Sequence, residues 1–317
     1  MRSRILLWTD RPDPYVRCID AAGLSERVAI DELPRNDRLS AVQCAETEAM
    51  LAWDAPPGLL PQMRKLRWIQ ALTAGVEGWL ALPDLPPDLT LSCARGTHRQ
   101  SMPENILGAL FHLTKPYSAV LEDQKRRQWT RRIATPLSGQ TIGILGLGAV
   151  GQDVARLGAA LGMRVIGTRR SGEPLPDVAE VFPPQRTRDV LTQADFVLLL
   201  LPATRETESF INRERLGWMK PTAWLLNFGR GHLIDDADLI EAVKAKRIAG
   251  AMLDVFRQEP LPADHPFWTT EGVIVLPHIG GMHPNRDRIV ARLFVDNLTR
   301  FLDGQPLREV VDRAAGY

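Results

Sequence analysis

The sequence predicts an α/β protein with two domains, each built around a parallel β-sheet. The chain has 317 residues, about twice the usual length of a single domain. Short apolar runs alternate with amphipathic or turn-rich stretches, which is typical of strands joined by helical crossovers. One run, Phe196–Leu201, is apolar throughout, as expected for a strand buried on both faces of a parallel sheet.

The first hundred residues contain several apolar runs bounded by Pro, Gly and Asp, and these predict strands. After Pro103 the pattern changes to helical spacing over Glu104–Leu113, with Ser101 as a candidate N-cap. The Arg-rich stretch Gln124–Arg132 is expected to be a solvated helix face or a connecting segment. The predicted strands of this part are Arg4–Trp8, Ala49–Trp53, Leu66–Leu72 and Leu89–Cys93.

A more regular block of alternating strands and helices follows. Its predicted strands are Thr141–Leu145, Met163–Thr168, Phe196–Leu201, Ala223–Asn227, Ala249–Asp254 and Val273–Leu276. The predicted helices are Val150–Leu161, Thr187–Gln193, Arg213–Met219, Asp236–Lys246 and, near the end, Asn285–Leu302.

Charge and cysteine usage exclude several classes of function. Lys plus Arg total 39 against 38 for Asp plus Glu, so neither nucleic acid nor an anionic membrane is expected as a partner. Cys18, Cys44 and Cys93 are far apart and have no histidine at metal-ligand spacing, which predicts reduced thiols and no metal site. No signal peptide or membrane span is evident, and we expect a cytoplasmic protein.

A glycine-rich fingerprint lies between the first strand and the first helix of the regular block. Gly146, Gly148 and Gly151, with Ala149 and Val150 between them, form a GxGxxG motif. The first glycine permits a tight turn, the second lets the backbone approach a pyrophosphate, and the third lets helix and strand pack closely. Because strand, glycines and helix are in register, the motif predicts a dinucleotide site at a helix N-terminus.

The end of the next strand predicts which dinucleotide binds. NAD sites place an Asp or Glu there, about twenty residues on, to bind the ribose 2′-hydroxyl. Here Thr168, Arg169, Arg170 and Ser171 follow one another, and the first carboxylate is Glu173. Two arginines flanked by hydroxyls suit the 2′-phosphate of NADP, so we expect NADP to be preferred, with NAD possible.

Three segments after later strands carry an Arg, a Glu and a His in one cofactor-binding domain. His278 could protonate the oxygen of a ketone that has received a hydride, and Glu259 could orient the ring and favour its charged form. Arg230 could bind the carboxylate of a 2-keto acid and polarise its carbonyl group. His283 is an alternative, but His278 follows its strand directly and is preferred.

These residues make the sequence similar to the D-isomer-specific 2-hydroxyacid dehydrogenase family. The likeness extends from about residue 50 to the C-terminal segment 297–317. Within the family the chain most resembles the NADPH-dependent glyoxylate/hydroxypyruvate reductases of the A type, above all in Thr141–Gly146 and Gly250–Phe256.

The resemblance implies a role for each residue of the site. Arg230 would bind substrate, Glu259 would pair with the catalytic histidine, and His278 would act as the acid and base. Asp254 would hold the nicotinamide carboxamide. Leu201, Pro202, Asn227 and Phe228 would line the cofactor, and Trp53, Ala74, Gly75 and Val76 would contact the substrate. For Trp53, a place in the core at the end of its strand is an equally good interpretation. The bulky Phe228, and the Gly280-Gly281 pair where Ala and Ser are commoner, depart from the family pattern.

The resemblance also implies an architecture. Residues 99–284 would form a dinucleotide-binding Rossmann domain, inserted into a flavodoxin-like substrate domain of residues 1–98 and 285–317, with the active site in the cleft. The helix over Glu104–Leu113 would contribute to a homodimer. Its apolar face is equally compatible with an ordinary core.

We therefore expect an NADPH-dependent oxidoreductase that reduces small 2-keto acids such as glyoxylate and hydroxypyruvate to 2-hydroxy acids. Two alternatives stay open. One is another D-2-hydroxyacid dehydrogenase, for example of the phosphoglycerate type. The other is a non-enzymatic, nucleotide-sensing protein similar to the corepressors that share this fold.

Overall fold

The computed structural model describes residues 2–314 and 316, and the chain divides into two compact units. The first unit comprises both ends of the chain, up to Thr97 and from His283 onward, and the second comprises His98–Met282. The sequence predicted the boundaries after residues 98 and 284. Met1, Ala315 and Tyr317, which the sequence assigns to the substrate domain, lie outside the described residues.

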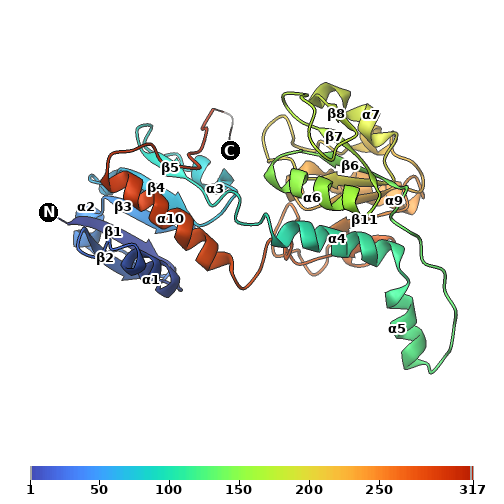
Figure 1. Cartoon of the computed structure of the whole chain (residues 1–317), viewed down its shortest axis with the longest axis horizontal. Helices are drawn as coiled ribbons and strands as arrows, with labels where there is room; N and C mark the ends of the chain where they lie inside the picture. Colours follow the sequence, from blue (N-terminus) through green and yellow to red (C-terminus); the bar gives the residue numbers. More distant parts are fainter. Residues whose placement is uncertain (1, 315, 317) are drawn as a thin grey trace. The chain divides into compact units, whose positions relative to one another are not determined.

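The first unit is a five-stranded parallel sheet in the order β2-β1-β3-β4-β5 (Figure 1). Its strands are β1 (Ser3–Trp8), β2 (Val28–Leu33), β3 (Ala49–Ala52), β4 (Trp68–Ala71) and β5 (Thr90–Ser92). Its helices are α1 (Asp13–Ala21), α2 (Ala41–Glu46), α3 (Glu77–Leu80) and α10 (Arg286–Leu302).

The C-terminal helix completes the core of this N-terminal sheet. Helix α10 lies beside α1 on one face, and Phe294 stacks on Trp68 of β4 with ring centroids 5.4 Å apart. On the opposite face, Leu6 and Ile69 pack with Trp79 of α3. Because both faces are covered, the buried residues of β1 are apolar on both sides, as expected for a parallel sheet, whereas β4 also buries the polar Gln70.

The second unit is a seven-stranded parallel sheet in the order β12-β11-β10-β9-β6-β7-β8. Its strands are β6 (Thr141–Leu145), β7 (Arg164–Thr168), β8 (Glu180–Phe182), β9 (Phe196–Leu199), β10 (Trp224–Asn227), β11 (Gly250–Leu253) and β12 (Val273–Val275). Its helices are α4 (Ser101–Thr114), α5 (Tyr117–Lys125), α6 (Ala149–Ala160), α7 (Thr187–Leu191), α8 (Arg213–Leu216) and α9 (Asp236–Lys244).

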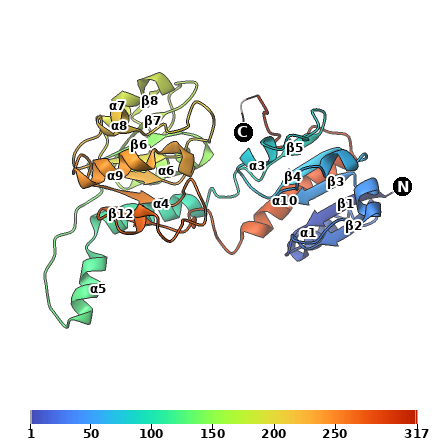
Figure 2. The same ribbon diagram turned by 180° about the vertical axis from the view of Figure 1, so that it is seen from behind.

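Helices cover both faces of this sheet, as Figures 1 and 2 show from opposite sides. Ile106 of α4 and Val154 of α6 belong to one core cluster, and Leu216 of α8 and Leu239 of α9 belong to the other. The strand order reverses between β6 and β9, since the chain runs outward through β7 and β8 and then continues on the other side of β6. Ligands of open parallel sheets bind outside the carboxyl ends of the strands at such a switch point.

The two sheets confirm the predicted fold class, an α/β protein with two parallel-sheet domains. Some elements differ in detail. Strands β2 and β8 and helices α1, α2, α3 and α5 were not individually predicted, and β9 ends at Leu199 rather than at Leu201. Ser101 is the first residue of α4 rather than its N-cap, because its hydroxyl instead donates to the carbonyl oxygen of Met282, 3.2 Å away.

Candidate active site

The glycine fingerprint forms the turn between β6 and α6, and each glycine meets a different environment. Gly146 has a φ of +110°, and a Cβ there would lie 2.8 Å from the carbonyl carbon of Leu200. A Cβ on Gly151 would overlap the carbonyl oxygen of Gly146. A Cβ on Gly148 would meet no atom within 4 Å. The fold therefore requires the outer two glycines, whereas Gly148 faces space in which a ligand can approach the backbone.

Helix α6 begins at this turn. Its N-cap is Gly148, which has no side chain to accept the first amide hydrogens, and Ala149 and Val150 form the first turn. The amide groups and the dipole at a helix N-terminus favour negative charge. The turn thus has the room and the electrostatics that a dinucleotide pyrophosphate requires.

The two predicted arginines follow β7, which pairs with β6, so they lie at the same edge of the sheet as the glycine turn. Thr168 is buried, Arg169 is half-buried, and Arg170 and Ser171 are exposed. The backbone of Arg169 donates to the carbonyl oxygen of Phe182 at 2.9 Å, which fixes its place after the strand. Its guanidinium lies 3.8 Å from the Glu173 carboxylate in an exposed pair, a weak interaction that a phosphate could displace.

Asn227, at the end of β10, shapes the turn that carries Arg230. The Asn227 side chain is fully buried, its Nδ2 donates to the carbonyl oxygen of Arg230 at 2.9 Å, and its Oδ1 accepts the Gly229 N–H at 3.1 Å. The Arg230 guanidinium donates to the carbonyl oxygen of Gly229 at 2.8 Å. A Cβ on Gly231 would overlap the backbone of Phe256, so this turn packs directly on the segment that follows β11.

Glu259 and His278 meet as the sequence predicted. Nδ1 of His278 lies 2.6 Å from Oε2 of Glu259, and the other carboxylate oxygen accepts the Phe256 N–H at 2.9 Å. Because both oxygens of Glu259 are engaged, its carboxylate fixes the orientation of the imidazole. The His278 side chain is 54% exposed, and Nε2 is the ring nitrogen turned away from Glu259.

Asp254, predicted to hold the nicotinamide carboxamide, bonds to the segment after His278. It is only 1% exposed, and its two carboxylate oxygens accept the N–H groups of Ile279 and Gly280, each at 2.8 Å. Burial raises the pKa of the Asp254 carboxyl above its ordinary value, and the two N–H groups partly offset this effect.

Three polar residues in and just before α4 hold the same segment, a role that sequence reasoning assigned to none of them. His98, Ser101 and Asn105 bond to backbone carbonyl groups of residues 279–282. His98 lies in the turn before α4, whereas Ser101 and Asn105 lie four residues apart on the helix and therefore on one face of it. No short pattern in the sequence indicates which carbonyl groups they meet.

The remaining predicted site residues lie at the carboxyl edge of the first unit's sheet. Trp53 lies 4.3 Å from the guanidinium carbon of Arg286 and 5.4 Å from that of Arg35, both measured from the ring centroid. Between β4 and α3, Thr73 donates to the carbonyl oxygen of Gly75 at 2.6 Å and shapes the loop containing Ala74 and Val76. His283, the alternative histidine, belongs to this unit, and no described group bonds to its buried Nε2.

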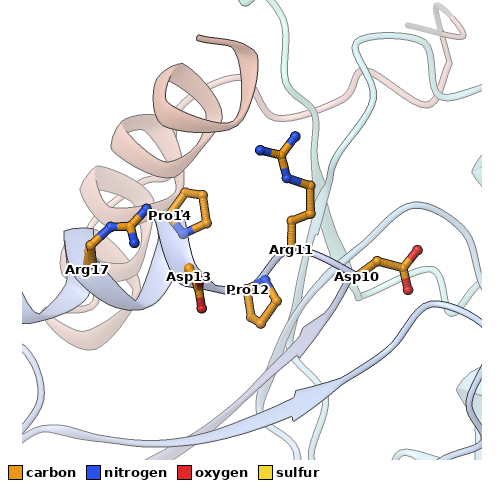
Figure 3. A pocket seen from close by; sticks show the side chains of 6 residues that line it. All are labelled: Asp10, Arg11, Pro12, Asp13, Pro14 and Arg17. Carbon is orange, nitrogen blue, oxygen red and sulfur yellow. The ribbon is translucent and has the colours of Figure 1, made fainter. Parts of the chain in front are cut away.

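A hollow of about 220 Å³ lies where β1 leads into α1, and Figure 3 shows its charged side chains projecting in different directions. Arg11 lies 3.2 Å from Asp287, and Asp10 accepts the N–H of Arg35 at 2.9 Å. These groups already have partners, and we assign no ligand to the hollow. It is lined by Asp10, Arg11, Pro12, Asp13, Pro14 and Arg17.

The predicted cofactor and catalytic residues therefore gather in the second unit. Apart from Trp53, Ala74, Gly75 and Val76, all lie at or just after the carboxyl ends of β6, β7, β9, β10, β11 and β12. Among residues 2–314 and 316, no group of three or more His, Cys, Asp or Glu side chains is arranged to hold a metal ion. None of the helices in this part of the chain is long and apolar enough to cross a membrane.

Comparison with known families confirms the resemblance seen in the sequence. Residues 107–280 match the family model described as "D-isomer specific 2-hydroxyacid dehydrogenase, NAD binding domain". The match covers more than half of the chain, and the protein belongs to this family.

Individual relatives extend the likeness over the whole chain. A glyoxylate/hydroxypyruvate reductase A from Serratia proteamaculans is 31% identical over 93% of this chain and 95% of its own length. The crystal structure of a D-isomer-specific 2-hydroxyacid dehydrogenase family protein from Aeromonas salmonicida has a TM-score of 0.89 and 34% identity, covering 99% of this chain and 100% of that one.

A third relative was crystallised with a dinucleotide. It is the NADPH-dependent glyoxylate/hydroxypyruvate reductase from Sinorhizobium meliloti, in complex with NADP and sulfate. Its structure has a TM-score of 0.85 and 28% identity, covering 100% of both chains.

Replacing Gly148 and Gly151 by alanine, one at a time, should distinguish the glycine needed for dinucleotide binding from the glycine needed for folding. Gly148→Ala should change the free energy of unfolding by less than about 1 kcal/mol, because its added methyl group meets no atom within 4 Å. It should nevertheless weaken NADPH binding at least about tenfold, since that methyl group occupies the approach of the pyrophosphate. Gly151→Ala should lower the free energy of unfolding by about 1–3 kcal/mol through steric overlap. Chemical denaturation and calorimetry measure the two effects, and unchanged binding by Gly148→Ala would place the dinucleotide elsewhere.

Proposed function

We propose that this protein is an NADPH-dependent reductase of small 2-keto acids such as glyoxylate and hydroxypyruvate. The observation that carries the proposal is the hydrogen bond between His278 and Glu259 at the carboxyl edge of the sheet that also carries the glycine fingerprint. Membership of the 2-hydroxyacid dehydrogenase family and the activities named for its relatives support it.

Each residue of the site then has a chemical task. Bound NADPH supplies the hydride that reduces the keto carbon. His278 donates a proton from Nε2 to the oxygen on which negative charge develops, and Glu259 holds the ring in the orientation that this transfer needs. Arg230 binds the substrate carboxylate through its planar guanidinium and polarises the neighbouring carbonyl group.

The cofactor residues are proposed on the same basis. The fingerprint residues Gly146–Gly151 would receive the pyrophosphate at the N-terminus of α6, where the open space beside Gly148 supports the fit. Thr168, Arg169, Arg170 and Ser171 would surround the 2′-phosphate. Leu201, Pro202, Asn227, Phe228 and Asp254 would line the remainder of the dinucleotide, with Asn227 acting through the backbone it shapes.

The substrate residues of the first unit stay predictions. By resemblance, the backbone of Ala74, Gly75 and Val76 would receive a carboxylate, and Trp53 would contact the substrate. The hydrogen bond from Thr73 to Gly75 supports a defined loop conformation there. The cytoplasmic localisation predicted from the sequence also stays a prediction.

We also propose a homodimer, and the most exposed apolar side chains near the predicted helix α4 lie just after it in the chain. Ile106 and Leu110 of α4 are fully buried in their own unit, so they are not available to a partner. Helix α5 and the segment after it project from the second unit in both views (Figures 1 and 2), and there Trp129 is 94% exposed and Ile133 97% exposed. Contiguous exposed apolar patches mark interaction surfaces, and we propose that these two side chains belong to one.

Light scattering should give a mass of twice 35.4 kDa for the unmodified protein. Replacing Trp129 and Ile133 together by Asp should halve that mass, because buried carboxylates would oppose association. A monomeric unmodified protein at micromolar concentration would exclude the dimer.

Replacing His278 by Ala should remove most of the turnover and leave NADPH binding nearly unchanged. General acid–base groups typically contribute about 10²- to 10⁴-fold to the rate, and kcat with glyoxylate should fall within that range. His283→Ala is the matched control and should keep normal kcat. If instead His278→Ala retains more than about half of the activity and His283→Ala loses it, the acid has been assigned to the wrong histidine.

The unmodified protein should use NADPH better than NADH by about ten- to a thousand-fold in kcat/KM. A hydrogen bond to a charged group contributes roughly 1.5–3 kcal/mol. Because about 1.4 kcal/mol corresponds to a factor of ten, contacts to the 2′-phosphate give a preference in this range. Arg169→Asp should reverse the preference, because a carboxylate repels the phosphate and accepts a ribose hydroxyl. Arg156→Asp, the same charge change at an exposed position of α6, should leave the preference unchanged.

Added salt should weaken the preference, since Arg169 and Arg170 are reached by solvent. Steady-state kinetics with both cofactors measure these effects. Equal or better use of NADH by the unmodified protein would refute the assignment of the two arginines.

A further inference from the structure

The backbone immediately after His278 is held from two sides, by the buried side chain of Asp254 and the exposed side chain of Asn105. On one side, Asp254 accepts the N–H groups of Ile279 and Gly280. On the other side, Nδ2 of Asn105 lies 2.9 Å from the carbonyl oxygen of Gly280 and 3.3 Å from that of Ile279. Two consecutive residues are therefore bound through both their N–H and their C=O groups.

The next two residues are anchored to the turn before α4 and to the first residue of that helix. Nδ1 of His98 lies 2.8 Å from the carbonyl oxygen of Gly281, and the Ser101 hydroxyl donates to that of Met282 at 3.2 Å. Asn105 also lies 3.4 Å from the Ser101 hydroxyl, which joins these contacts into one network.

The departures from the family pattern are consistent with this close packing. A Cβ on Gly280 would lie 2.6 Å from Oδ2 of Asp254 and 2.8 Å from Cδ1 of Phe228. A Cβ on Gly281 would lie 2.7 Å from Nδ1 of His98. Glycine at both positions thus lets Asp254, Phe228 and His98 approach the segment closely.

His278 itself needs such support. Its φ of +52° lies in the left-handed region, which is unfavourable for a residue with a Cβ and persists only where the surroundings determine it. Glu259 fixes the ring through Nδ1, but a hydrogen bond to the ring alone does not determine the backbone from which the ring extends.

We propose that Asn105 is a positioning residue for His278. Together with Asp254 it fixes the backbone of Ile279 and Gly280. Through this backbone it fixes the direction in which Nε2 of His278 presents its proton. This inference rests on the proposed function, because the direction of Nε2 matters only if His278 transfers a proton. Asn105 itself is on the exposed side of α4, so its replacement should not unfold the protein.

Two replacements of Asn105 test the proposal against one control. Asn105→Asp keeps the size of the side chain, but a carboxylate cannot donate and would face two carbonyl oxygens. Asn105→Ala removes the donor without adding repulsion. Glu104→Ala, at the neighbouring exposed position, is the control.

With glyoxylate and NADPH, kcat should fall at least about tenfold in Asn105→Asp and less in Asn105→Ala. The KM for glyoxylate, the Kd for NADPH and the thermal midpoint should stay close to those of the unmodified protein. Glu104→Ala should match the unmodified protein throughout. If Asn105 had a purely structural role, its replacement would change the thermal midpoint of unfolding or the affinity for NADPH, and not kcat alone.

Amide hydrogen exchange gives a readout that does not depend on activity. Exchange at Ile279 and Gly280 should be faster in both Asn105 variants and unchanged in Glu104→Ala. Normal kcat in Asn105→Asp overturns the proposal, and so does a reduced kcat with unchanged exchange. If the unmodified protein reduced no keto acid, the proposed function would fail. Unchanged amide exchange at Ile279 and Gly280 in the Asn105 variants would instead show that Asn105 does not hold this segment.

Discussion

The hydrogen bond between Nδ1 of His278 and Oε2 of Glu259 is the interaction on which the proposed chemistry depends, and most of the surrounding packing keeps it in place. Glu259 can offer this oxygen because its other oxygen is held by the N–H of Phe256. The backbone of Phe256 in turn packs against Gly231, next to Arg230. The three charged groups are thus connected through backbone contacts that leave little freedom between them.

The parallel sheet makes this arrangement possible. Strands β10, β11 and β12 are neighbours, so the segments that follow them leave the sheet at one edge. Residues far apart in the sequence meet there without long side chains having to span the distance. The unfavourable backbone conformation of His278 is located where several hydrogen bonds support it, in agreement with the general finding that strained residues gather at functional sites.

Much of this could be predicted from the sequence, because strong local signals carry it. The apolar strands, the three glycines and the order of Arg230, Glu259 and His278 each follow from a short pattern. The contacts of Asn105 and His98 could not be predicted, since a polar side chain on a helix or in a turn does not reveal which distant carbonyl group it meets. Likewise, nothing near Trp53 in the sequence indicates that the guanidinium of Arg286 lies over its ring.

The central claim is that a hydride passes directly from NADPH to the carbon of a keto acid while His278 protonates the oxygen. The most direct test uses NADPH deuterated at the nicotinamide carbon, on the face that loses its hydrogen, with mass spectrometry of the hydroxy acid formed from glyoxylate. The account predicts one deuterium on the product carbon with the unmodified protein, formed far more slowly by His278→Ala. A product without deuterium, or no product from any small keto acid, would contradict it.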